Sequence, residues 1–335
     1  MDIFYAFNDA YAAMAGISIF SLLKNNYDND KIVFHIVDSG IGQNNKVKIE
    51  NTILEYGQEV KFYKMPNFEQ ITEKKIDAKR WNINVFSKLF VGSILPDNVE
   101  KVICIDCDTV IVDSLHELWN TDLSNKVIGG VIECISTLYK TNLEKKSDDY
   151  YFNSGLVIFN VEELRKEKYE DLFWKCMQKY GSSLAYLDQD VINATIPQDK
   201  MYLLHPRYNA ITPMFCLDYS DFMKIRRSET YYSEKEFKEA KNNPCIIHYT
   251  TFFMNELRPW FENSKHPKVE EFIKYKKMSL WRDEDLWKDN RAITKKIKAK
   301  IIKILPMFIM KRIASYLHGI VVPKKNKKKM INVIN

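Results

Sequence analysis

Short apolar runs alternate with segments of helical periodicity in the first hundred residues, and this alternation limits the folds open to the chain. The apolar runs predict strands at residues 2–7, 31–38, 60–65 and 101–106. Between them, helical spacing predicts helices near 10–24, 43–56 and 83–95. Such a pattern is typical of βαβ units, whose strands lie parallel in one sheet.

The pattern is less regular after residue 120. Strands are predicted at 127–133, 150–160, 201–205 and 245–249, with helices near 161–180 and 188–195. We therefore expect an α/β domain with a mixed sheet over residues 1–265, long enough to bury its own core. Polar residues that follow the strands are the candidate ligand-binding residues, since ligands of such sheets bind beyond the carboxyl ends of the strands.

The charge of the chain is divided unevenly. The net charge is +6, but the stretch from Arg291 to the end holds 13 Lys or Arg and no Asp or Glu, which leaves 37 basic and 44 acidic residues before it. We predict a connecting segment over 266–290 and a basic tail over 291–335. The acidic body and the lack of a recognition motif argue against a nucleic-acid partner.

Six cysteines are scattered without a framework, and the first residues show no secretory signal, so we expect a reduced, cytoplasmic protein. Cys104 and Cys107 form a C-x-x-C, but no second pair completes a zinc site. We interpret both as residues that fill the core.

The stretch "KVICIDCDTVIV" places Asp106 and Asp108 between the apolar runs Val102–Ile105 and Val110–Val112, at the end of a strand that the sequence predicts to be buried. Residues two apart on an extended backbone face the same side, so both carboxylates can converge on one point. Such a pair favours a hard cation such as Mn²⁺ or Mg²⁺, which completes its shell with phosphate oxygens. The alternative is that one aspartate caps a turn and the other is solvated.

Two further stretches carry polar residues in unexpected places. Asn153, Ser154 and Gly155 interrupt an apolar strand, which indicates a bulge or the close approach of a ligand. In "LDQDVIN", Asp188 is either the N-cap of a helix or, with Gln189, Asp190 and Asn193, part of a site for a polyhydroxylated ligand.

His248 follows an apolar strand, and Arg258 lies ten residues further on. The histidine is either a core residue or a third metal ligand suited to Mn²⁺. The planar fork of Arg258 suits a diphosphate.

In their order along the chain these motifs resemble glycosyltransferase family 8. The matching stretches are "YAFNDAYA", "SKLFVGSILP", "VICIDCDTVI", "LHELWNTDL", "YFNSGLVIFN", "DQDVIN" and "HYT…RPW", which together cover residues 1 to about 262. The family comprises retaining, metal-dependent transferases of the GT-A fold, including bacterial lipopolysaccharide galactosyl- and glucosyltransferases and glycogenin. The resemblance therefore implies a GT-A catalytic domain at residues 1–265.

The resemblance also implies roles for the matching residues. Mn²⁺ or Mg²⁺ would be bound by Asp106, Asp108 and His248. The residues implied in donor binding, beside those two aspartates, are Ala6, Asn8, Asp9, Lys88, Cys107 and Arg258. The catalytic set is Asn153, Asp188, Gln189 and Asp190. Lys88 stands where the family has arginine, and Arg258 replaces a lysine in a loop that is longer here, with Thr251 at its glycine position.

The implied activity is transfer of galactose or glucose from a UDP-sugar to a glycan acceptor, for lipopolysaccharide, capsule or a related surface polymer. One alternative is transfer to a protein, including the chain itself, as in glycogenin. Another is a membrane-associated protein that binds nucleotide sugars without catalysis. Neither the oligomeric state nor the exact sugar follows from the sequence.

The basic tail predicts attachment to a membrane. Its helical face carries the apolar residues Ile293, Ile297, Ile301, Ile304 and Phe308, while lysines occupy the other faces and "PKKNKKK" follows. The apolar run is too short to span a bilayer, and Pro306 breaks or kinks it. We expect this basic amphipathic helix to lie on an anionic membrane, at its cytoplasmic face, near a lipid-linked glycan acceptor. The alternative is a helix docked on the body with a disordered basic end.

Overall fold

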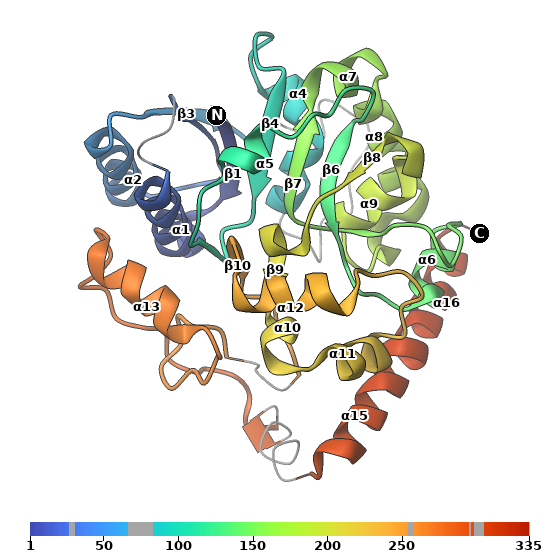
Figure 1. Ribbon diagram of the computed structural model, residues 1–335. Helices are drawn as coiled ribbons and strands as arrows, with labels where there is room; N and C mark the ends of the chain where they lie inside the picture. The colour runs from blue at the N-terminus through green and yellow to red at the C-terminus, as the bar shows by residue number, and fades with distance from the viewer. Residues whose placement is uncertain (27–30, 66–82, 254–256, 295, 298–304, 335) are drawn as a thin grey trace.

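The computed structural model describes residues 1–26, 31–65, 83–253, 257–294, 296–297 and 305–334. At its centre lies a seven-stranded sheet in the order β3-β2-β1-β4-β7-β6-β8 (Figure 1). The strands are β1 (Asp2–Phe7), β2 (Val33–Asp38), β3 (Glu59–Lys64), β4 (Lys101–Ile105), β6 (Ile128–Ile132), β7 (Phe152–Asn160) and β8 (Met201–Leu203). Each of them overlaps a strand predicted from the apolar runs.

The sheet is mixed, as the sequence predicts. Strands β1, β2, β3 and β4 run parallel, and β7 pairs antiparallel with both β4 and β6. The β-branched and aromatic residues of the central strands are almost completely buried, among them Ile3, Phe34, Ile103 and Val157. Their burial on both faces of the sheet explains why these strands appear in the sequence as continuous apolar runs.

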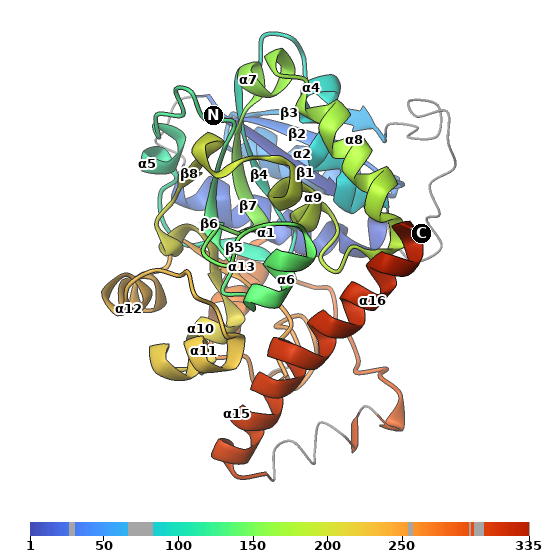
Figure 2. The same ribbon diagram turned by 90° about the vertical axis from the view of Figure 1, so that its right-hand side faces the viewer.

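Helices cover both faces of this sheet. In Figure 2, α8 (Tyr169–Tyr180) and α9 (Asp188–Thr195) lie in front of the sheet, and α1 (Ala12–Asn25) lies behind it. The remaining helices of the body are α2 (Gln43–Glu55), α4 (Val91–Ile94), α5 (His116–Trp119), α6 (Thr137–Asn142), α7 (Val161–Lys166), α10 (Thr212–Cys216), α11 (Tyr219–Arg226) and α12 (Glu234–Asn242).

Two predicted helices differ from the structure. The helix expected over 161–180 is divided into α7 and α8, because Lys168 between them takes a left-handed conformation with φ 54°. The helix expected over 83–95 is a 3-10 helix at Ile83–Phe90 followed by the single turn α4.

A second sheet of three strands, in the order β5-β10-β9, lies beside the first. Its strands are β5 (Thr109–Ile111), β10 (Ile246–His248) and β9 (Ala210–Ile211). The apolar runs before and after the two aspartates therefore belong to separate strands, β4 and β5, because the chain turns at residues 106–108 and passes from one sheet to the other. The Thr109 hydroxyl closes this turn by donating to the carbonyl of Asp106 at 2.9 Å.

The C-terminal part begins with α13 (Val269–Met278), which contacts α1. Later come α15 (Met307–Tyr316), a π-helical turn (Leu317–Val321) and α16 (Val322–Ile334), which run along the side of the body (Figure 2). Pro306 precedes α15 as its N-cap. Buried residues of this long helix, such as Met310, Ala314 and Met330, face the body, and the lysine-rich end is helical.

Two of the five apolar tail residues named above, Ile301 and Ile304, lie outside the described residues. Ile293, Ile297 and Phe308 are exposed. In the part of the chain that is described, no helix is long and apolar enough to cross a membrane.

Candidate active site

The turn between the two sheets brings together two carboxylates and a histidine. One possible ligand atom from each of Asp106, Asp108 and His248 lies within 4.8 Å of the other two. The amide of Asp106 donates to the carbonyl of Gly155 on β7, and that of Tyr249 donates to the carbonyl of Asp108, so the turn is attached to both sheets. Carboxylate oxygens with one imidazole suit Mn²⁺ or Mg²⁺, and the three residues therefore fit such an ion.

His248 is held in a fixed orientation. Its Nδ1 lies 2.9 Å from Oδ1 of Asn209, while its Nε2 lies 3.2 Å from Oδ1 of Asp108. A hydrogen bond at one ring nitrogen sets which nitrogen faces a metal, as is usual for metal-binding histidines. Gly155 makes room for the ring, because a Cβ built there would lie 2.1 Å from Cε1 of His248. The group that approaches Gly155 is thus a side chain of the protein, and the expected bulge is present as well, since the β6–β7 register shifts between the pairs Gly130–Val157 and Val131–Asn153.

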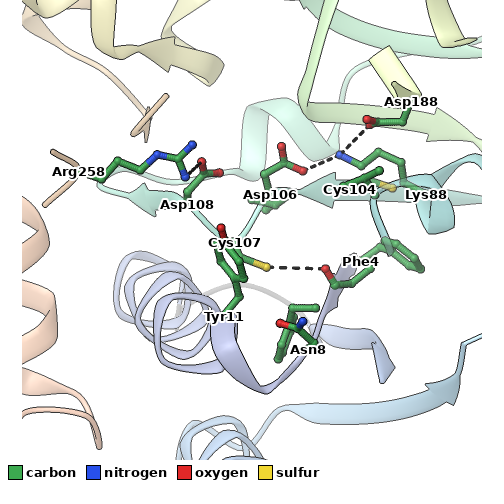
Figure 3. A pocket seen from close by; sticks show the side chains of 14 residues that line it. Phe4, Asn8, Tyr11, Lys88, Cys104, Asp106, Cys107, Asp108, Asp188 and Arg258 are labelled. Carbon is green, nitrogen blue, oxygen red and sulfur yellow. Dashed lines mark hydrogen bonds and ion pairs between the residues drawn. The ribbon is translucent and has the colours of Figure 1, made fainter. Parts of the chain in front are cut away.

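Two cations flank the carboxylates (Figure 3). Nζ of Lys88 lies 2.6 Å from Oδ1 of Asp106 and 3.4 Å from Oδ2 of Asp188, and it also donates to the carbonyl of Ser154 at 2.8 Å. Nη1 of Arg258 lies 3.0 Å from Oδ2 of Asp108. Lys88 and Arg258 thus approach the aspartate turn from different elements.

The pKa values of these groups follow from burial and charge. Burial would lower the pKa of Lys88, but the charges of Asp106 and Asp188 outweigh it and raise the pKa above its ordinary value. Burial would raise the pKa of Asp108, but His248 and Arg258 hold it at about 2. The pKa of Asp188 is raised, chiefly because the carboxyl is buried. The lysine is therefore a fixed positive charge, and Asp108 is ionised at neutral pH.

A cavity of about 320 Å³ lies on the β1 side of the turn and is drawn in Figure 3. Ala6, Asn8, Lys88, Cys107 and Arg258 line it together with Asp106, Asp108 and Asp188. Oδ1 of Asn8 is buried, and no described residue donates a hydrogen bond to it. Cys107 points away from the carboxylates, since its Sγ lies 3.9 Å from the carbonyl of Ala6.

Asp9 lies outside the lining of this cavity. Its Oδ1 accepts hydrogen bonds from the amide of Gly42 and from Asn45, both at 2.8 Å. These bonds, that of Asn45 first, lower the pKa of the exposed Asp9 carboxyl. The structure therefore places Asp9 beside the start of α2 rather than in the cavity.

A larger cavity of about 700 Å³ lies on the other side of the same turn. It shares Asp106, Asp108 and Arg258 with the smaller cavity. The described residues that line only this side include Glu133, Asn153, Tyr186, Gln189, Arg226, His248, Phe253 and His318. Of the implied catalytic residues, Asp188 therefore lies on one side of the turn, and Asn153 and Gln189 lie on the other.

The start of α9 is unusual in its backbone. Leu187, which precedes the helix, has φ 56°, a conformation that costs a side chain other than glycine roughly 1–3 kcal/mol. Asp188 is the first helical residue and makes no capping hydrogen bond, so the capping interpretation does not hold. Strain of this kind is concentrated at functional sites.

Asp190 does not line either cavity. Its Oδ1 accepts a hydrogen bond from the Tyr151 hydroxyl at 2.5 Å, and its Oδ2 accepts one from the amide of Tyr186 at 2.8 Å. Burial raises the pKa of this carboxyl to about 6. These bonds hold the loop before α9 against β7.

Several residues of the site were not identified from the sequence. Asn209 orients His248, and Glu133, Arg226 and Tyr186 line the larger cavity. Asn209 precedes the two-residue strand β9, whose pairing with β10 brings it beside His248. In the sequence, a polar residue between two apolar ones is only a weak indication of a functional role for Asn209. The pairing of β9 with β10 is not visible in the sequence.

Comparisons with known proteins agree with this geometry. The family model "Glycosyl transferase family 8" matches residues 2–264. General stress protein A of Bacillus subtilis is 26% identical over 284 residues, which is 84% of this chain and 94% of that protein. A lipopolysaccharide 1,2-glucosyltransferase of Escherichia coli is 23% identical, over 84% of this chain and 79% of its own.

Among solved structures, the galactosyltransferase LgtC in complex with donor and acceptor sugar analogs superposes with a TM-score of 0.69. The match covers 89% of this chain and all of that one, at 22% sequence identity. At this identity the likeness establishes the fold, and it confirms the expected GT-A architecture.

Proposed function

The chain belongs to glycosyltransferase family 8, and from this premise we propose that it transfers a hexose from a UDP-sugar to a glycan acceptor with retention at the anomeric carbon. Galactose or glucose is the proposed sugar, and lipopolysaccharide, capsule or a related surface polymer is the proposed product. The observation that carries the proposal is the Asp106, Asp108 and His248 cluster at the boundary of two cavities.

The smaller cavity suits the nucleotide. Asn8 offers a buried oxygen that lacks a donor within the described structure, as a site for the N–H of a pyrimidine base would. Lys88 and Arg258 supply positive charge beside the two aspartates, which suits a diphosphate. We assign Ala6 and Cys107 to the same wall, and Asp9 to the support of that wall through Gly42 and Asn45.

Cleavage of the bond between sugar and UDP leaves negative charge on the departing diphosphate. Mn²⁺ or Mg²⁺, held by Asp106, Asp108 and His248, would act as a Lewis acid that stabilises this charge. Arg258 and Lys88 add fixed positive charge at the same place. No general acid is needed for such a leaving group.

The sugar would lie where the two cavities meet. There, Asp188, Gln189 and Asn153 can accept or donate hydrogen bonds to hydroxyl groups and place an oxygen near the positive anomeric carbon of the transition state. We favour front-face attack by the acceptor, in line with the family. Asp190 would act through the loop that it anchors rather than by contact with the sugar.

The larger cavity is the proposed entrance for the acceptor, and the C-terminal helix is the proposed membrane attachment at the cytoplasmic face. α15 exposes Met307, Phe308, Ile313 and Tyr316 beside Arg312, while Lys311 is paired with Asp221 of the body. Apolar and basic side chains together suit the surface of an anionic membrane. The acceptor would then be a glycan linked to lipid.

The test is UDP release from a panel of UDP-sugars, measured with Mn²⁺ and with EDTA. We expect release from one sugar that depends on the metal and falls at least about 100-fold in Asp106→Asn, which keeps the shape of the side chain. Asp283→Asn is the matched control, since that side chain is 95% exposed and outside the site. Failure of every UDP-sugar to react, together with failure of UDP to bind, would refute the proposal.

A further inference from the structure

A residue of the C-terminal helix reaches the larger cavity. His318 lies in the π-helical turn between α15 and α16, and its side chain is among those that line the cavity. Its ring centre is 6.4 Å from that of Phe253, and the two rings are inclined by 30°. The same cavity is lined by Asp106 and His248 of the metal cluster. The tail therefore faces the space next to the reaction centre.

Two hydrogen bonds attach the chain to the body directly after His318. The buried hydroxyl of Ser136 donates to the carbonyl of Gly319 at 2.7 Å. The Asn142 amide donates to the carbonyl of Pro323 at 3.0 Å. Both donors belong to the segment that follows β6 and includes α6, so this segment fixes the position of His318 relative to the cavity.

The close fit at the next residue also depends on the sequence. A Cβ on Gly319 would lie 2.5 Å from Cδ of Arg227, and the Arg227 Nε donates to the hydroxyl of Ser315 at 2.8 Å. A π-turn inserts one residue into a helix and is frequent at functional sites. Here the turn and the glycine together let the helix follow the body while His318 remains at the mouth of the cavity.

The lining of the cavity combines aromatic rings with charged groups. Tyr186, Phe253 and His318 supply rings, while Glu133 and Arg226 are partly buried, with 9% and 19% of their side chains exposed. Oε1 of Glu133 and Nη2 of Arg226 are 3.9 Å apart, which is too far for a hydrogen bond. Oε2 of Glu133 accepts a hydrogen bond from Nδ2 of Asn153 at 2.6 Å, so Oε1 is the oxygen of this carboxylate that keeps capacity to accept from a ligand, beside the Arg226 guanidinium.

A carbohydrate fits this lining better than other solutes. The C–H face of a pyranose contacts an aromatic ring, and its hydroxyls both donate to a carboxylate and accept from a guanidinium. We propose, on the basis of the proposed function, that the C-terminal helix completes the acceptor site. His318 and Phe253 form one wall against which a pyranose of the acceptor glycan lies, and Glu133 and Arg226 bind its hydroxyls.

The assignment gives the tail two roles in one element. The outer face of α15 would attach to the membrane, while the π-turn that follows it touches the acceptor. Docking at Ser136 and Asn142 then sets the distance between the membrane surface and the sugar that receives the hexose. His318 is accordingly a positioning residue for the acceptor.

The test measures sugar binding directly, without turnover. Saturation-transfer NMR is recorded on the full chain with UDP, Mg²⁺ and a panel of methyl glycopyranosides. We expect at least one pyranoside to bind through its ring protons, with a Kd that rises about two- to tenfold in His318→Ala and returns toward the wild-type value in His318→Phe. Lys328→Ala, an exposed change on α16, is the control and should leave the Kd unaltered.

Binding with the same Kd in wild type and His318→Ala, or no binding by any pyranoside, would overturn the proposal. Since His318 is exposed, its replacement should not unfold the chain. The UDP-release assay separates the two proposals. If UDP release depends on the metal but the Kd of the pyranoside is the same in wild type and His318→Ala, only the role of the tail is refuted. Sugar binding that depends on His318, with neither UDP release nor UDP binding, would support the sugar site at the tail and refute the proposal of a UDP-sugar donor.

Discussion

Replacement of Gly155 by alanine tests how the metal cluster is built. Gly155 lies on β7, directly beneath the imidazole of His248, and a Cβ at this position would lie 2.1 Å from Cε1 and 2.5 Å from Nδ1 of the ring. Ordinary contact begins at 3.4 Å, so the ring would have to retreat by about 1.3 Å. It cannot do so freely, because Nδ1 is bound to Asn209 and the residue belongs to β10.

Two magnitudes follow from this geometry. Adding one carbon to a closely packed site costs about 1–3 kcal/mol of the free energy of unfolding. A displacement of about 1 Å at a reaction centre lowers the rate by roughly 100-fold. We therefore expect Gly155→Ala to remain folded but to bind Mn²⁺ more weakly and to release UDP about 100 times more slowly.

The matched control is Gly129→Ala, in the neighbouring strand of the same sheet. A Cβ there would lie 2.7 Å from Cγ2 of Ile158, so this change also overfills the core but touches no residue of the site. Urea denaturation gives the stability of both variants, and calorimetry with Mn²⁺ gives the metal affinity. If Gly155→Ala lost no more activity and no more metal affinity than Gly129→Ala, the assignment of His248 would be refuted.

Three further changes test other parts of the structure. Lys88→Met leaves Asp106 and Asp188 without their cation and should lower the free energy of unfolding by about 3 kcal/mol, measured by urea denaturation. Lys88→Arg keeps the charge and should retain most of that stability. Equal stability of the wild type and the Met variant would contradict the role of the charge. Asn209→Ala removes the partner of His248 and should weaken Mn²⁺ binding about 10–100-fold in calorimetry; unchanged affinity would count against it. Burial lowers the pKa of His266 from 6.5 to about 4, so the unfolded chain binds a proton more readily than the folded one. The free energy of unfolding should therefore be highest above pH 6.5 and fall by up to about 3 kcal/mol as the pH drops to 4. His266→Gln should flatten this profile in denaturation curves, and an equally steep profile would exclude the histidine as its cause.

The central strands and most helices were predictable because their signals are local. An apolar run of five or six residues indicates a strand whichever strand it pairs with. The predicted helix over 188–195 has the same bounds as α9. The sequence did not reveal that the apolar runs before and after the two aspartates belong to different sheets, because periodicity does not show where the chain changes sheets. The helix predicted over 161–180 failed because Lys168 adopts a left-handed conformation that its residue type does not indicate.

Site residues divide in the same way. Asp106, Asp108 and His248 were found because polar residues at the ends of apolar strands are visible in the sequence. Asn209 and His318 were not found, since each acts through a contact between distant segments. The bond from Ser136 to Gly319, for example, joins residues 183 positions apart.

The position of the aspartate turn explains why a buried strand ends in two carboxylates. β4 pairs with β1 and β7 in the large sheet, whereas β5 pairs with β10 in the small one, so the chain must leave one sheet and enter the other between them. Residues 106–108 occupy that crossing, where Asp106 and Asp108 border both cavities and Cys107 lines only the smaller one. The pairing of β5 with β10 places His248 opposite Thr109, next to the turn. The same crossing therefore separates the two cavities and brings together the three proposed metal ligands. Any change that shifts β10 along β5 should alter both the metal cluster and the boundary between the cavities.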